Sequence, residues 1–280
     1  MDPDRKKMSK SKGNVVTPAD VLVQHGSDAV RYWAASSRLG TDAAFDPKNP
    51  TQIKIGRRLA IKILNASKFI LGFAGDDAAP VTEPVDRSML ARLDVVVAQA
   101  TAAFEGFDHA RALELTESFF WTFCDDYLEL VKERAYGEVG PEQASAVAAL
   151  RRALSTLLRL FAPFVPFATE EAWSWSNDDS VHRATWPVVA ETAADGVGEI
   201  ALLDLASRAL TGIRRAKTDA KASQKSAVTS ATIGGSAAEV ALLAQVAADL
   251  KAVGRIADLT FVEADELVVT DIVLATVSEI

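Results

Sequence analysis

The sequence predicts a mainly α-helical protein in three parts: a lysine-rich loop with supporting helices (1–49), an antiparallel helical bundle (50–198) and a small α+β module (199–280). Three observations predict this organisation. A lysine-rich, glycine-ended segment opens the chain. From about residue 50 to 175, apolar residues recur every three or four positions, which is typical of amphipathic helices. In the last 80 residues, β-branched runs appear between helical stretches.

The opening segment, Lys7–Ser11, reads Lys-Met-Ser-Lys-Ser and is followed by a lysine, a glycine and an asparagine. Residues 1–14, which include Arg5 and Lys6, carry a local charge of +3. Ammonium groups, hydroxyls and free backbone amides are suited to binding polyphosphate. From the residues alone, a solvated basic terminus is the alternative.

Two short helices are expected next. Thr17 is predicted to cap the first helix, with Pro18 at its first position, and His25-Gly26 ends it. The second covers residues 28–37, where Asp28 and Arg31 are spaced to form a local ion pair.

Four long amphipathic helices near 51–73, 86–105, 108–136 and 142–162 are joined by short loops, which favours an antiparallel bundle. Their apolar positions, including the aromatic stripe of the third helix, are predicted to form the core. Pro166 is expected to open a shorter helix through Trp175, and residues 176–198 to form a connector that is extended around Val181-His182. The predicted core positions are Ile55, Leu59, Ile63, Ala66, Ile70, Met89, Leu93, Val96, Ala100, Phe104, Leu113, Thr116, Phe120, Phe123, Tyr127, Leu130, Val147, Leu150, Leu154, Leu157 and Phe161.

The C-terminal part is predicted to contain a helix near 199–221, a strand at 227–233, a helix near 236–252 and strands at 256–262 and 267–275. This αβαββ order implies a three-stranded sheet. No long charged heptad segment follows, so no coiled-coil arm is expected.

The composition narrows the functional classes. The net charge of −8 argues against nonspecific polyanion binding by the whole surface. The single cysteine, Cys124, and three scattered histidines suggest neither an internal disulfide nor a protein-bound metal. No apolar run approaches the roughly 20 residues that span a bilayer, and no signal peptide is recognisable. We therefore expect a cytoplasmic protein without a membrane partner.

The string Lys-Met-Ser-Lys-Ser-Lys-Gly-Asn resembles the second signature of class I aminoacyl-tRNA synthetases, whose loop closes over ATP. The Gly-x-Asp-Ala-x-Arg pattern at 26–31 resembles the helix that follows this loop in the family. The resemblance implies a catalytic role for Lys10, which would stabilise charge developing on ATP. It also implies an ATP-binding loop of Lys7, Met8, Ser9, Lys10 and Ser11, with Mg²⁺ accompanying ATP.

The helical region is similar to the valyl, isoleucyl and leucyl group of this family. Residues 62–69 resemble the entry helix of its anticodon-binding domain, and 119–129 resemble the valyl members specifically. Residues 160–173 match a Leu-x-Pro-Phe-x-Pro-Phe-x-Thr-Glu-Glu-x-Trp segment, although Ala162 replaces an expected histidine. Ser180-Val181-His182 and Trp186-Pro187 resemble the ending of the group's pattern. The resemblance covers roughly residues 5–225.

What the resemblance implies is the C-terminal third of a ligase that activates valine with ATP and transfers it to tRNA(Val). No His-Ile-Gly-His motif occurs, and in the family the amino-acid pocket and editing domain lie upstream of the lysine loop. The isolated chain is therefore expected to be inactive. Two alternatives are a tRNA-binding module without chemistry and an isoleucyl fragment. Many bacterial isoleucyl enzymes end in a cysteine zinc cluster, which one cysteine cannot build.

Two basic rows could contact tRNA phosphates, although a solvated surface is the default reading of such rows. Neither row suggests a DNA partner. The first row is Lys54, Arg57, Arg58 and Lys62, and the second is Arg214, Lys217, Lys221 and Lys225.

Overall fold

The computed structural model describes residues 2, 6–15, 17, 19–43, 45–46, 49–189 and 199–275. Arg5, Pro18 and the 190–198 part of the predicted connector lie outside the described residues. Contacts divide the chain into two compact units. Unit 1 contains 1–72, 95–119 and 153–191, and unit 2 contains 73–94, 120–152 and 192–280. The predicted domain boundaries at 49/50 and 198/199 stay predictions.

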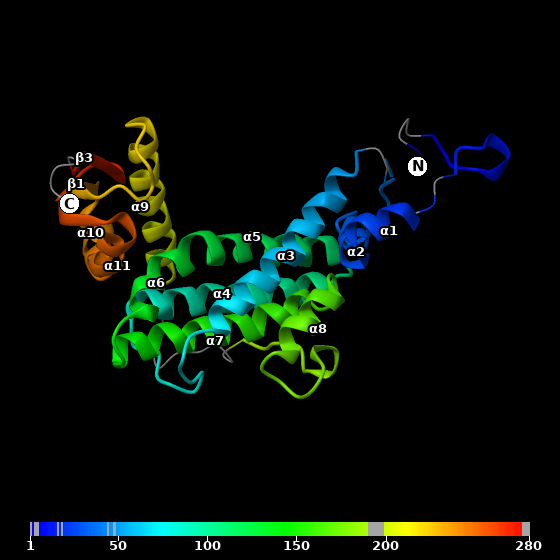
Figure 1. Cartoon of the computed structure of the whole chain (residues 1–280), viewed down its shortest axis with the longest axis horizontal. Helices are drawn as coiled ribbons and strands as arrows, with labels where there is room; N and C mark the ends of the chain where they lie inside the picture. The colour runs from blue at the N-terminus through cyan, green and yellow to red at the C-terminus, as the bar shows by residue number, and fades with distance from the viewer. Residues whose placement is uncertain are drawn as a thin grey trace. The chain divides into compact units, whose positions relative to one another are not determined.

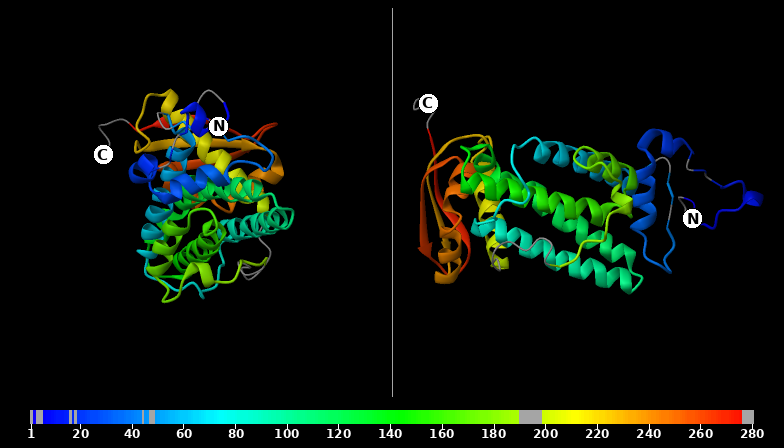
Figure 2. Two further views of the ribbon diagram at one scale, coloured as in Figure 1. Left: turned by 90° about the vertical axis from the view of Figure 1, so that its right-hand side faces the viewer. Right: turned by 90° about the horizontal axis from the view of Figure 1, so that it is seen from below.

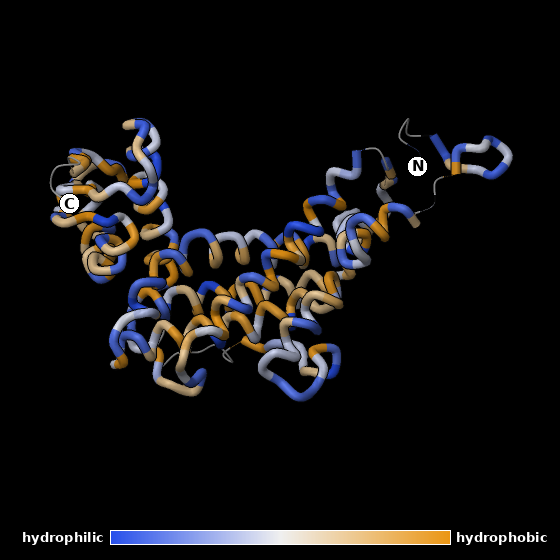
Figure 3. The backbone as a smooth tube through the Cα atoms, in the orientation of Figure 1, coloured by the Kyte–Doolittle hydropathy of each residue, from blue (hydrophilic) through white to orange (hydrophobic). Residues whose placement is uncertain are grey.

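The predicted helical bundle is confirmed (Figures 1 and 2). Its helices begin and end within two residues of the expected positions. Proline opens both α4 and α7, where the missing N–H costs nothing because the first turn lacks an acceptor. Nearly all predicted core positions are buried, and apolar segments recur along these helices (Figure 3). The bundle helices are α3 Thr51–Leu71, α4 Pro84–Glu105, α5 His109–Thr122, α6 Leu128–Tyr136, α7 Pro141–Phe161 and α8 Pro166–Ser174.

The third predicted helix is not uniform. A π-helical turn, η2 (Phe123–Tyr127), separates α5 from α6 where one continuous α-helix was expected. The wider turn keeps the Phe123 and Tyr127 side chains buried and leaves Asp126 to pair with Arg214, at 2.9 Å between Oδ1 and Nη1. Apolar periodicity could not reveal this turn, because the stripe of buried residues runs through it.

The predicted three-stranded sheet is also confirmed, with strand order β2-β1-β3. β1 pairs parallel with β2 and antiparallel with β3. The helix expected near 236–252 is two helices, because the chain breaks at the buried Val246. Ser236 and Glu239 form a capping box at the start of the first. The elements are α9 Ile200–Asp219, β1 Val228–Gly235, α10 Ala237–Ala244, α11 Ala247–Gly254, β2 Ile256–Glu263 and β3 Val268–Leu274.

The connector after α8 differs from its prediction. Val181–Arg183 form a short 3₁₀ turn, η3, instead of extended chain. The Ser180 hydroxyl accepts a hydrogen bond from the His182 backbone N–H, which fixes the start of this turn.

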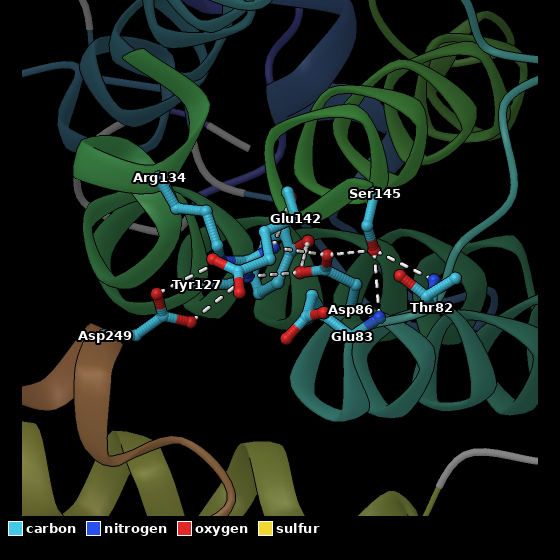
Figure 4. A network of polar contacts seen from close by, with 8 residues as sticks. All are labelled: Thr82, Glu83, Asp86, Tyr127, Arg134, Glu142, Ser145 and Asp249. Carbon is cyan, nitrogen blue, oxygen red and sulfur yellow. Dashed lines mark hydrogen bonds and ion pairs between the residues drawn. The ribbon is translucent and has the colours of Figure 1, made fainter. Parts of the chain in front are cut away.

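A polar network centred on the fully buried Asp86 joins α4, α6, α7 and α11 within unit 2 (Figure 4). Arg134 donates two hydrogen bonds to Asp86, at 2.8 and 2.9 Å, and two to Asp249, both at 3.1 Å. The Tyr127 hydroxyl donates to Asp86 at 2.8 Å, and the Ser145 hydroxyl does so at 2.7 Å. Asp86 therefore accepts four hydrogen bonds from three side chains.

The electrostatics of this network follow from its burial. Burial raises the pKa of Asp249, and the hydrogen bonds from Arg134 oppose that rise. Burial and the Asp86 charge raise the pKa of Tyr127 well above its usual value. Burial works to lower the pKa of Arg134, but the two carboxylates raise it, so Arg134 stays charged.

We predict that Arg134→Met destabilises the fold by about 3–5 kcal/mol, because it leaves two buried carboxylates without their cation. Urea unfolding at neutral pH measures this loss. Arg215→Met is the matched control, since Arg215 is 82% exposed and lies 3.8 Å from Asp219. The control is expected to change stability by less than about 1 kcal/mol. Equal losses in both variants would contradict the role given to the network.

Candidate functional site

The lysine-rich loop is closed by the side chain of Asn14. Its Oδ1 accepts from the Ser9 backbone N–H at 2.9 Å, and its Nδ2 donates to Asp2 at 2.9 Å and to the Lys7 carbonyl at 3.3 Å. Between Ser9 and Asn14, residues Lys10–Lys12 form a 3₁₀ turn, η1, that ends at Gly13 with a φ of 66°. Glycine suits this left-handed position because it has no Cβ. The Gly13-Asn14 pair therefore sets the shape of the loop.

The charged side chains of the loop face solvent. Lys7, Lys10 and Lys12 are exposed, and the Ser9 and Ser11 hydroxyl oxygens lie 3.2 Å apart. The loop thus offers three mobile cations and two hydroxyls, a set of donors suited to a polyphosphate anion.

Met8 has a different position from its neighbours. It packs against a buried cluster of Val21, Ala29, Phe45 and Ile53, which come from α1 (Ala19–His25), α2 (Ser27–Ala35), the segment before α3, and α3. Met8 is therefore an apolar anchor for the loop.

Asp28 and Arg31 do not form the predicted local pair, and instead they hold the segment that leads into α8. The two carboxylate oxygens of Asp28 accept from the Phe167 and Ala168 backbone N–H groups, at 3.1 and 2.7 Å. Arg31 donates to the Pro163 carbonyl at 2.9 Å. The Asp and Arg of the Gly-x-Asp-Ala-x-Arg pattern therefore contact the Pro-Phe-x-Pro-Phe segment. We refer to these bonds as the α2–α8 clamp.

The first basic row lies on α3, and its members differ in their surroundings. Lys54 is exposed, whereas Arg57 donates to the Gln24 carbonyl at the end of α1, at 3.1 Å. Arg58 lies close enough to Tyr32 for its charge to lower the pKa of that phenol, although burial and a hydrogen bond to Glu117 raise it overall. Lys62 is half-buried.

The prediction that Lys217 lies on an exposed basic row is wrong. Its side chain is 1% exposed and donates to the Gln224, Ser226 and Gly254 carbonyls at 3.1, 2.9 and 2.7 Å. Leu210, Ile213 and Lys217 are spaced i, i+3, i+7, so Lys217 continues the buried face of α9. Lys217 is a structural lysine of the C-terminal module.

The other members of the second row are separated from one another. Arg214 donates to Asp126 at 2.9 Å and to the Asp125 carbonyl at 2.6 Å. Lys221 and Lys225 are exposed beyond the end of α9. The second row is therefore not a continuous patch.

Within the described ranges, no group of three or more histidine, cysteine, aspartate or glutamate residues could hold a metal ion. None of the helices in that part of the chain is long and apolar enough to cross a membrane.

The helical bundle is that of the anticodon-binding domain of a class I tRNA ligase. A family model described as the anticodon-binding domain of tRNA ligase matches residues 86–233, and the chain belongs to this family. A second model, described as tRNA synthetases class I (I, L, M and V), matches residues 1–46.

Similar proteins include several valine--tRNA ligases. The one from Leifsonia xyli subsp. xyli is 67% identical over 100% of this chain and 33% of its own length. The one from Thermobifida fusca is 59% identical over 95% of this chain and 30% of its own. The chain thus spans about one third of these relatives and matches their C-terminal part.

A solved structure shares the fold. This is the agnB2 LeuRS of Agrobacterium radiobacter K84, in a ternary complex with tRNA and LeuAMS. The match covers 69% of this chain and 24% of the LeuRS chain, with a TM-score of 0.52. The sequence identity is 23%, so this likeness shows the fold alone.

We predict that Lys217→Met lowers the free energy of unfolding by about 1–3 kcal/mol, because three carbonyls lose their shared donor. Thermal or urea unfolding measures the change. Lys221→Met removes the same charge from an exposed position nearby and is expected to change stability by less than about 0.5 kcal/mol. A Lys217 variant as stable as the Lys221 variant would contradict the structural role.

Proposed function

We propose that the chain is the C-terminal part of a cytoplasmic valine--tRNA ligase, which activates valine with ATP and transfers it to tRNA(Val). The observation that carries this proposal is the 67% identity to a valine--tRNA ligase over the whole chain, from the lysine loop through the helical bundle. In this proposal the loop contacts ATP and the bundle binds the anticodon arm of the tRNA.

The loop geometry supports an ATP role. Lys10 begins the 3₁₀ turn that Gly13 ends, and the Asn14 side chain, after the turn, bonds the backbone of Lys7 and Ser9 before it. A lysine presented in this way supplies a point charge to a phosphate group whose negative charge grows during adenylate formation. Lys7 and the hydroxyls of Ser9 and Ser11 would bind the same polyphosphate, with Mg²⁺ carried by ATP itself.

The structure narrows the proposed tRNA contacts. Lys54, Arg57, Arg58 and Lys62 on α3, with Arg214 and Lys221, remain the proposed phosphate-contacting residues. Lys217 leaves the set because its ammonium is buried among carbonyls. Phosphate contacts position an RNA and contribute most of the salt dependence of its binding.

The α2–α8 clamp supports an arrangement in which loop and bundle act together. Met8 packs on a cluster that includes α2, and α2 in turn holds the start of α8, all within unit 1. The helix that carries the clamp therefore also supports the loop.

In the full-length ligase, we expect Lys10→Ala to slow valine-dependent adenylate formation on the order of 10²- to 10³-fold, as for other single donors to a developing charge. The KM for valine should change little, because the lost contact belongs to the transition state. ATP–pyrophosphate exchange kinetics measure both quantities.

Lys12→Ala is the matched control, since it removes the same charge from the same exposed turn. We expect Lys12→Ala to lower the rate of adenylate formation by less than tenfold. Equal losses in the two variants would reduce the role of Lys10 to the overall charge of the loop.

The 280-residue chain alone is expected to show no valine-dependent ATP–pyrophosphate exchange.

For tRNA(Val) binding by the chain, we expect affinity to fall steeply as salt rises. Lys54→Ala should lower the slope of log K against log salt by about 0.7–0.9, the contribution of one phosphate contact. Lys132→Ala, on α6, is the control and should leave the slope unchanged. An unchanged slope in the Lys54 variant would place the RNA away from the start of α3.

A further inference from the structure

A cavity of about 360 Å³ lies within unit 1, at the place where the α1–α2 junction, α3 and α8 meet. Its size falls within the roughly 300–1,000 Å³ of small-molecule sites. The residues that line it include Asp28, Arg57, Ile61, Leu64, Phe167 and Glu171.

Much of the lining is apolar, and two of its large apolar side chains are exposed. Ala60 and Leu64 of α3 contribute to the apolar part. Phe167 is 65% exposed and Ile61 is 46% exposed. Both side chains line the cavity, and an accessible phenyl ring gives a flat surface on which a planar ring can stack.

Positive charge lies on the α3 side of the cavity. Arg57 uses Nη1 for the Gln24 carbonyl, and a guanidinium has five N–H donors, so it has capacity for a second acceptor. Lys54 is exposed one turn earlier on α3. The first turn of α2 contributes the Asp28 carboxylate, whose oxygens already accept from the Phe167 and Ala168 backbone N–H groups. On the α8 side, Glu171 contributes a carboxylate that accepts from the Trp175 indole at 3.1 Å.

We propose that this cavity binds one unstacked nucleotide of the tRNA, with its base against Phe167 and Ile61 and its phosphate at Arg57. An aromatic platform beside a cation matches the two parts of a nucleotide, because proteins read RNA largely through splayed-out bases. This proposal rests on the tRNA binding proposed above. It adds a nucleotide site formed by the same helices as the α2–α8 clamp.

The test measures tRNA(Val) binding to the 280-residue chain by fluorescence anisotropy. Phe167→Ala is expected to raise the Kd about 5- to 150-fold, the range for one base–aromatic stack. Phe167→Trp should retain affinity because it keeps an aromatic face. Arg57→Gln should lower the salt slope by about 0.7–0.9. Phe107→Ala is the matched control, since Phe107 is 81% exposed but lies in the turn after α4.

Folding is checked by thermal unfolding of each variant. The Phe167 substitution keeps the backbone N–H that donates to Asp28, so the α2–α8 clamp should survive. Ile61→Thr, on a different helix, gives a second test and should also weaken binding. If Phe167→Ala and Ile61→Thr bind tRNA as tightly as Phe107→Ala, the nucleotide site is wrong.

The outcomes separate the two proposals. A wild-type chain that binds no tRNA would overturn the tRNA-binding function itself. If neither cavity substitution changes the Kd for tRNA(Val), only the nucleotide site is overturned. The site is also overturned if these variants keep tRNA affinity but lose association with a separately expressed N-terminal part of a valine--tRNA ligase, since a protein surface would then occupy the cavity.

Discussion

The structure of unit 2 depends on the requirement that a buried guanidinium be neutralised. Arg134 is almost enclosed, and its side chain forms two bonds to each of two carboxylates from different helices. Because an unpaired buried charge is strongly destabilising, the positions of Asp86 and Asp249 relative to Arg134 are tightly constrained. The π turn before α6 contributes to the same network, since its last residue, Tyr127, donates a hydrogen bond from its hydroxyl to Asp86.

In unit 1, a carboxylate also joins two helices, but its hydrogen-bond donors are backbone N–H groups and not an arginine. Asp28 satisfies two N–H groups at the start of α8, a position where four helix N–H groups have no intrahelical acceptor. Most helices obtain this cap from the residue beside their own first turn. Here the cap comes from α2, 139 and 140 residues earlier in sequence, so it ties two segments together as well as capping the start of a helix.

The bundle was predictable because its signals are local. Proline at 84, 141 and 166 and glycine at 72, 106 and 137 mark helix ends, and the apolar spacing identifies the buried faces. The same spacing could have identified Lys217 as buried, since it follows Leu210 and Ile213 on one face. At this position the apolar spacing, and not the positive charge, indicates the surroundings of the side chain.

What the sequence could not supply were the partners of polar residues. Asp28 and Arg31 stand three apart, so a local ion pair was the simplest expectation, yet their partners lie 132 to 140 residues away in the sequence. The π turn and the break at Val246 likewise leave the apolar pattern unchanged. The cavity lined by Phe167 requires three segments to meet, which no local pattern encodes.

The bonds made by Asn14 have a mechanical consequence for the lysine loop. They connect Asp2, Lys7 and Ser9, so the backbone from 7 to 14 is cross-braced rather than free to bend at any residue. A displacement of Lys10 therefore either carries Lys7 with it or breaks hydrogen bonds of the Asn14 amide. Met8 packs on the apolar cluster, so we expect the loop to move about that contact. Lysines on a backbone braced in this way are expected to change position together.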